Sequence, residues 1–309
     1  TESMDRVASA RMEHVRWHSD VTLRSPTLVA AFTGWSDGAE AASTALRTMV
    51  EGWGATLVAS IDPEEFTDFA STRPHVRLND GVTREIMWPQ VAVWAASTPG
   101  GDVLLLLGPE PSLRWRLFTE ELLDLARHYG TQMALSLGAL LADVPHSRQV
   151  HLIGTATEQE IIDRFDLQRS RYEGPTGILG VFQDACSRAG MPAASLWAAT
   201  PAYASQISSP KAAMALVERA AEMIGTPAPV LALQAAVEDY ERQVDDLLEQ
   251  DPELRGYVRR LESIADSGED DEDEDGDDTD DVEPIDAQAE GDQLIEELER
   301  FLRDQDGSS

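Results

Sequence analysis

Between residues 27 and 225, short continuous apolar runs alternate with longer segments whose apolar residues recur at helical spacing. A run that is apolar at every position is typical of a strand covered by helices on both sides. The alternation therefore predicts a three-layer α/β/α domain with a mostly parallel, mixed sheet. The expected strands are 27–33, 55–61, 91–97, 103–108, 133–138, 150–154 and 195–200, and the expected helices are 39–51, 114–129, 157–167, 176–189 and 209–225.

Two other regions depart from this alternation. Residues 75–88 contain two short polar runs around Asn79-Asp80-Gly81, which predicts a β-hairpin. After residue 228, apolar residues spaced four and three apart predict a helix, and Asp251-Pro252-Glu253 predicts the start of a second one. These two helices are expected to pack on the core domain or on another subunit, because two short helices alone are marginally stable.

The acidic residues are concentrated near the C-terminal end. The chain has 57 Asp and Glu against 24 Lys and Arg, a net charge of −33, and the stretch 266–292 is rich in acids and lacks Lys and Arg. Such a stretch has too little apolar surface to fold. The predicted order is an N-terminal segment (1–24), an α/β core (25–228), a helical hairpin (229–265), a disordered acidic linker (266–291) and a C-terminal amphipathic helix (292–304).

The charge also narrows the classes of partner. A body this acidic repels nucleic acid and anionic lipid, so neither is an expected partner. The longest apolar run, residues 103–107, is too short to span a bilayer, and no signal-peptide pattern is found, which favours a cytoplasmic protein. The six histidines are scattered, so no metal and no cofactor are expected. The lone Cys186 is expected to be a buried, small apolar side chain.

One motif raises the question of hydrolase chemistry. The segment Gly34-Trp35-Ser36-Asp37-Gly38 matches G-x-S-x-G, the elbow that carries the nucleophile of α/β-hydrolases. However, it follows the first clear core strand, which leaves no earlier loop for an oxyanion hole, and nearly half of the chain follows the last histidine. A simpler interpretation is a tight turn in which Asp37 accepts hydrogen bonds from the next helix. Because the turn lies at the carboxyl edge of the sheet, Trp35 and Asp37 are candidates for ligand binding.

Three more polar clusters complete the candidate edge. Glu110 and Arg114 either project over this edge or form an ion pair that caps the helix at 114–129. The loop with Asp143, His146 and Arg148 is either an acid–base constellation or an ordinary polar turn. A third segment precedes a helix whose N-terminus could hold an anion, although its spacing matches no phosphate loop. The candidate ligand or contact residues are Gly34, Trp35, Asp37, Gly38, Glu110, Arg114, Asp143, His146, Arg148, Tyr172, Glu173 and Gly174, and none is assigned as catalytic.

Taken in order, several segments resemble one known family. They are GWSDGAEAA (34–42), ADVPHSRQV (142–150), GTA (154–156), YEGPTGILGVFQDAC (172–186), and SLWAATPAY followed by SPKAAMAL (195–216). These segments look like the bacterial, chiefly actinobacterial, branch of the proteasome assembly chaperone 2 family. The resemblance spans roughly residues 25–225. It implies a fold similar to that of purine nucleoside phosphorylases and hydrolases, and a homo-oligomer such as a trimer.

Two hypotheses for the function follow. The resemblance implies a non-enzymatic cytoplasmic assembly chaperone or scaffold, with proteasome components as protein partners. Archaeal relatives can dock through a hydrophobic–Tyr–any tail, and the ending RDQDGSS lacks one, so docking by that route is not expected. The alternative is a small-molecule (nucleoside-like) binding protein, or a phosphorylase- or hydrolase-type enzyme, that uses the loops at the carboxyl edge of the sheet. Such an enzyme needs a phosphate pocket and a purine-binding carboxylate, and no motif in the sequence matches either of them.

Overall fold

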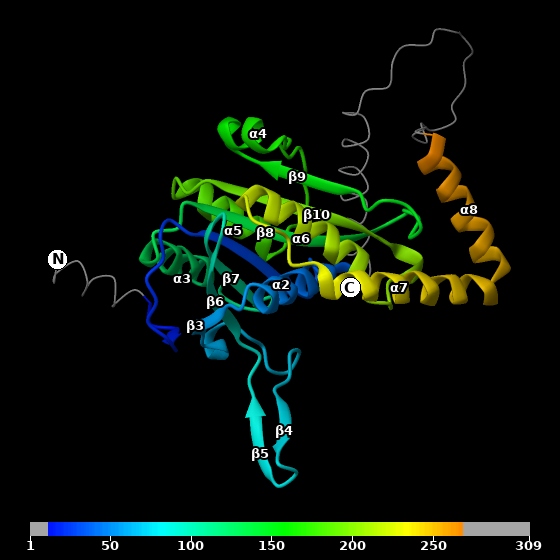
Figure 1. Cartoon of the computed structure of the whole chain (residues 1–309). Coiled ribbons are helices and arrows are strands. Elements are labelled where there is room, and N and C mark those ends of the chain that lie inside the picture. The colour runs from blue at the N-terminus through cyan, green and yellow to red at the C-terminus, as the bar shows by residue number, and fades with distance from the viewer. Residues whose placement is uncertain (1–11, 268–309) are drawn as a thin grey trace.

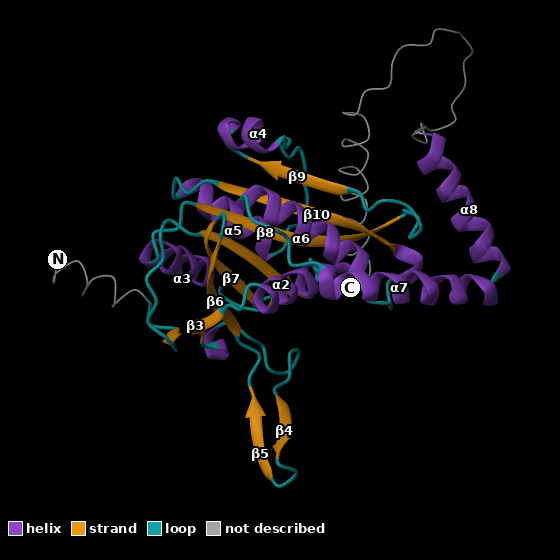
Figure 2. Cartoon of the chain, in the orientation of Figure 1, coloured by secondary structure: helices purple, strands orange, loops and turns teal. Residues whose placement is uncertain are grey.

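The computed structural model describes residues 12–267 (Figure 1). Within this range, a central sheet is covered by helices on both faces, as Figure 2 shows by secondary structure. The three-layer α/β/α architecture expected from the sequence is therefore confirmed. The C-terminal helix expected at 292–304, and the acidic linker apart from Asp266 and Ser267, lie outside the described residues.

The central sheet is mixed and has the strand order β1-β3-β6-β7-β2-β8-β10-β9. The four consecutive strands β7, β2, β8 and β10 are parallel, and the pairings outside them are antiparallel. Because parallel strands end at the same edge, the loops that follow them meet there. The strands are β1 (Val15–Trp17), β2 (Thr27–Thr33), β3 (Thr56–Ile61), β6 (Val91–Thr98), β7 (Gly101–Pro109), β8 (Met133–Ala142), β9 (Leu152–Ala156) and β10 (Ala193–Pro201).

Strand β2 shows why an uninterrupted apolar run becomes a strand here. Val29 and Ala31 pack in the core layer that includes α2 and α6, whereas Leu28, Ala30 and Phe32 pack in the layer that includes α3 and α5. Successive side chains of a strand point to opposite faces, so a strand between two helical layers needs apolar residues throughout. The helices of the body are α2 (Ala41–Gly52), α3 (Trp115–His128), α4 (Gln159–Phe165), α5 (Ile178–Arg188) and α6 (Pro210–Ile224).

The helical hairpin predicted after residue 228 is present as α7 (Leu231–Gln250) and α8 (Pro252–Ser267). Between them, Asp251 Oδ1 accepts hydrogen bonds from the backbone N–H groups of Glu253 and Leu254, both at 3.0 Å. This is the helix cap expected from the sequence. Figure 1 shows α7 leading away from the body and α8 turning from its far end.

A second hairpin projects from another part of the body, below β3 in the view of Figure 1. It consists of β4 (His75–Asn79) and β5 (Thr83–Met87), which pair with each other and with no other strand of the described chain. The loop between them has three residues, of which Asp80 and Gly81 have φ values of 53° and 70°, the left-handed region that tight hairpin turns use. Every residue of both strands is exposed. We call residues 75–88 the arm.

Every strand and helix expected between residues 27 and 225 is present, with ends shifted by a few residues. Strand β1 is not predicted from the sequence, because three residues are too few to show a period; it pairs antiparallel with β3. Cys186 is buried as expected, and burial raises its pKa to about 12. Among residues 12–267, no helix is both long enough and apolar enough to cross a membrane.

Candidate functional site

The turn after β2 carries the G-x-S-x-G segment to the carboxyl edge of the sheet. The backbone N–H of Asp37 donates to Gly34 O at 3.1 Å, which closes the turn. Asp37 Oδ1 accepts a hydrogen bond from the backbone N–H of Ser43 at 3.0 Å, in the first turn of α2. Burial raises the pKa of the Asp37 carboxyl, and the hydrogen bonds from Ser43 oppose that shift. The turn therefore contains the helix cap expected of Asp37.

Ser36 is not arranged as a nucleophile. Its side chain is 2% exposed, and its Oγ has no hydrogen-bond partner in the part of the chain that the structure describes. A serine nucleophile needs a general base within hydrogen-bond reach. The backbone instead ties this residue to the sheet, because Ser36 O accepts from the N–H of Ala139 at 2.9 Å. The geometry favours the structural interpretation of the motif over the hydrolase hypothesis.

Glu110 and Arg114 separate in the structure. Glu110 Oε1 accepts a hydrogen bond from the backbone N–H of Ile178 at 2.8 Å, so this carboxylate caps the start of α5. Burial raises its pKa, while that hydrogen bond opposes the shift. Arg114 pairs with Glu65 at 2.5 Å. The alternative of a Glu110–Arg114 ion pair that caps α3 is therefore wrong, because each side chain finds a nearer partner from another loop.

Of the three candidate residues that precede α5, only Tyr172 lines a hollow at this edge. Tyr172 Oη donates to Pro175 O at 2.5 Å, and Glu173 and Gly174 are exposed. The hollow measures about 90 Å³, and its wall includes the side chains of Trp35, Tyr172 and Trp197. Sequence reasoning did not single out Trp197, because it lies within the apolar run of β10. The hollow is thus partly formed by candidate residues and partly by a core strand.

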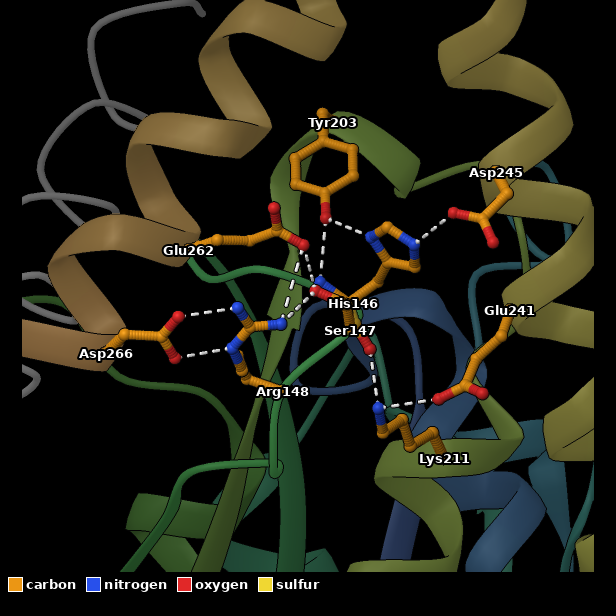
Figure 3. Close-up of polar contacts among 9 residues, drawn as sticks. All are labelled: His146, Ser147, Arg148, Tyr203, Lys211, Glu241, Asp245, Glu262 and Asp266. Atoms are coloured by element: carbon orange, nitrogen blue, oxygen red, sulfur yellow. Dashed lines mark hydrogen bonds and ion pairs between the residues drawn. The ribbon is translucent and has the colours of Figure 1, made fainter.

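The predicted cluster of Asp143, His146 and Arg148 separates as well, and Figure 3 shows what His146 and Arg148 contact. His146 is buried; its Nδ1 and its backbone N–H both contact Tyr203 Oη at 2.8 Å, and its Nε2 contacts Asp245 Oδ1 at 3.2 Å. Asp143 is exposed. The acid–base constellation of Asp143, His146 and Arg148 is therefore wrong, because the carboxylate at the imidazole comes from α7.

Arg148 and Lys211 extend the same network to both helices of the C-terminal hairpin. Arg148 Nε and Nη2 donate to the two carboxylate oxygens of Asp266 at 2.6 Å, and these hydrogen bonds lower the pKa of Asp266 (Figure 3). Lys211 Nζ donates to His146 O at 2.6 Å and to Glu241 at 2.7 Å. The loop at 145–148 is therefore a docking site for α7 and α8.

The sequence could not reveal these partners. Tyr203, Asp245 and Asp266 follow His146 and Arg148 by between 57 and 118 residues and share no motif with them. Among residues 12–267, no group of three or more His, Cys, Asp or Glu side chains is placed to hold a metal ion. His146 and Arg148 of this loop instead contact the two helices of the hairpin.

Comparison with known proteins identifies the family. The sequence matches the PAC2 family over residues 31–248. The chain belongs to the PAC2 family. The match includes most of the α/β core, the arm and nearly all of α7, so it extends beyond the C-terminal end of the 25–225 region of the resemblance. A comparison with curated proteins finds no match.

Solved structures of PAC2 proteins agree with this assignment. The chain is similar to a PAC2 family protein from Streptomyces avermitilis, with 40% identity over 75% of this chain and 99% of that one, at a TM-score of 0.70. It is also similar to the Mycobacterium tuberculosis proteasome-assembly chaperone homologue Rv2125, with 42% identity over 75% and 99% of the two chains, at a TM-score of 0.69. Pyrococcus furiosus PbaB, described as an archaeal proteasome activator, shares the fold at 14% identity, a TM-score of 0.63 and coverage of 75% and 97%.

Proposed function

We propose that this PAC2 protein is a non-enzymatic, cytoplasmic assembly chaperone or scaffold that acts on proteasome subunits. The proposal draws its partner from the proteasome-assembly chaperone homologue that is 42% identical. The geometry of the candidate edge fits a binding role, because the hydroxyl of Ser36 has no base beside it among the described residues. We also propose a homo-oligomer, for which the trimer implied by the sequence resemblance is the specific expectation.

The observation that carries the proposal is the exposed apolar face of the arm. Of the nine large hydrophobic side chains that are exposed in the described chain, six lie in the arm, namely Val76, Leu78, Val82, Ile86, Met87 and Trp88. A two-stranded hairpin is marginally stable in water unless another surface covers its apolar face. Contiguous exposed apolar surface of this kind marks a protein contact.

The register of the arm separates an apolar face from a polar one. Val76 pairs with Ile86 and Leu78 pairs with Arg84, so this face is apolar apart from Arg84, and Trp88 shares it by the period-two rule. Met87 pairs with His75 and lies on the other face. On the other face, Glu85 accepts hydrogen bonds from Arg77 at 3.1 Å and from Asn79 at 2.9 Å. One side of the arm is thus satisfied by its own polar contacts, whereas the other is left for a partner. We assign that partner as an unassembled proteasome subunit, whose apolar subunit interface stays exposed until the ring closes.

Reconstitution tests the proposal directly. Proteasome α and β subunits from the same organism are co-expressed with and without the full chain, and native gels measure the yield of assembled core particle. We expect the chain to raise that yield and to co-migrate with an assembly intermediate. An unchanged yield, together with no complex between the purified chain and either subunit, would exclude the proposed role.

A pair of variants then tests the arm. Ile86→Glu places a charge on the apolar face, and Thr83→Glu places the same charge on the polar face of the same strand. We expect the first to abolish the gain in assembly and the second to retain it. If Ile86→Glu instead leaves assembly intact and changes the oligomeric state by light scattering, the arm contacts a second copy of the chain.

A further inference from the structure

The hollow at the carboxyl edge of the sheet has the composition of a ligand site. It lies where the turn after β2, the strands β9 and β10 and the start of α5 meet. Its volume of about 90 Å³ corresponds to roughly three water molecules, since each occupies about 30 Å³ in the liquid. The lining consists of Trp35, Ser36, Ile153, Thr155, Ser170, Tyr172, Thr176, Gly177, Leu179, Gln183 and Trp197. The volume therefore suits one small ring.

Two tryptophan side chains in this wall are accommodated by glycines. A Cβ added at Gly177 would lie 2.8 Å from Trp35 Cε3, and a Cβ added at Gly138 would lie 2.5 Å from Trp197 Cε3. Neither distance leaves room for any other residue, so each indole lies directly against the main chain. Both rings are half-buried and border the same hollow. The local sequence thus holds two aromatic surfaces in place around a small space.

Two polar groups in the wall can donate hydrogen bonds to an occupant. The Ser36 hydroxyl is buried without a partner among the described residues, an arrangement that costs free energy unless something else pairs with it. Gln183 Oε1 accepts a hydrogen bond from Ser195 Oγ at 2.8 Å, which fixes the amide and leaves its N–H₂ group as the donor. No lining residue is a Lys, Arg, His, Asp or Glu.

We infer that this hollow binds a small, neutral, planar ring that carries carbonyl or ring-nitrogen acceptors. Indole walls favour a flat apolar face, and the donors of Ser36 and Gln183 favour acceptor atoms on its rim. An anion finds no positive charge in the lining, and a cation finds no carboxylate there. The site is independent of the proposed role on the proteasome, since it lies on the body and does not include the arm.

Small probes test the inference with the full chain. Uracil and nicotinamide are neutral rings with acceptors; toluene is a neutral ring without them, and choline is a cation. Each is titrated while tryptophan fluorescence and the thermal midpoint of unfolding are measured. We expect uracil or nicotinamide to change the fluorescence saturably and to raise the midpoint, and toluene and choline to do neither. If neither acceptor-bearing ring binds, or if toluene or choline binds as tightly, the inference is wrong.

Three variants locate the binding. Gln183→Leu removes the donors at nearly constant shape, and Ser36→Ala removes only the orphan hydroxyl. Each variant is expected to bind the probe about tenfold more weakly, because one buried acceptor of the probe is left unpaired. Gln250→Leu is the matched control, because that glutamine lies at the exposed end of α7. Unchanged affinity in both Gln183→Leu and Ser36→Ala would place the probe elsewhere and overturn the assignment.

Discussion

At the scale of single residues, a buried and a half-buried carboxylate at the sheet edge act as helix caps. Asp37 accepts from the first turn of α2, and Glu110 accepts from the first residue of α5. Both carboxyls have a raised pKa because burial penalises their charged form. A negative charge at a helix N-terminus is stabilised by the unpaired N–H groups and the helix dipole. The same carboxylates that looked like a ligand site in the sequence therefore hold two helices against the sheet.

Replacing Glu110 with Gln gives a prediction about pH. The folded chain binds the Glu110 proton more tightly than the unfolded chain, in which this carboxyl titrates near 4.5. The contribution of Glu110 to the stability of the fold is therefore greatest below pH 4.5, and it is lost as the pH rises through the raised pKa. Glu110→Gln keeps an acceptor for Ile178 without that titration. We expect the variant to gain stability relative to the wild type as pH rises above about 4.5.

Urea unfolding curves at several pH values measure this difference. Asp143→Asn serves as the control, since it removes a carboxylate that is exposed. A Glu110→Gln variant whose stability relative to the wild type falls as pH rises would contradict the assigned direction.

At the scale of elements, the 145–148 loop joins the helical hairpin to the core by contacts of unequal burial. The imidazole of His146 is 3% exposed, whereas Arg148 and Asp266 are 38% and 58% exposed. Solvent screens an exposed ion pair, whereas a buried hydrogen bond has no water to replace it. The buried His146–Tyr203 contact is therefore expected to contribute more to docking than the ion pair beside it.

Tyr203→Phe tests this ranking. The change removes the hydroxyl that contacts both the ring and the backbone N–H of His146. We expect a loss of about 1–3 kcal/mol in the free energy of unfolding, because a buried N–H is left unpaired. Hydrogen exchange should show α7 and α8 opening more often. Arg148→Ala, which affects the exposed pair, is expected to have the smaller effect, and the reverse order would show that the ion pair dominates.

At the scale of the whole molecule, charge opposes compaction. The net charge is −33, and much of it lies in the acidic stretch 266–292. Like charges repel within a Debye length of about 10 Å at 0.1 M salt, so added salt favours the folded state. We expect the thermal midpoint of the full chain to rise with sodium chloride concentration.

A chain that ends at Ser267 is the matched comparison for this effect. It lacks most of the acidic stretch, so its thermal midpoint should rise less over the same range of salt, as measured by differential scanning calorimetry. Equal slopes for the two chains would show that the acidic stretch does not contribute to the repulsion.

The sequence by itself determined the elements of the core apart from β1, and the tertiary structure decided their contacts. Continuous apolar runs such as 27–33 specify a strand covered on both faces, and Asp251 specifies a helix start, because these are local effects of periodicity and capping. The partners of His146, Glu110 and Arg114 come from loops and helices distant in the chain, so no spacing could indicate them. The hollow between Trp35 and Trp197 likewise exists only once β2, β10 and α5 are packed together.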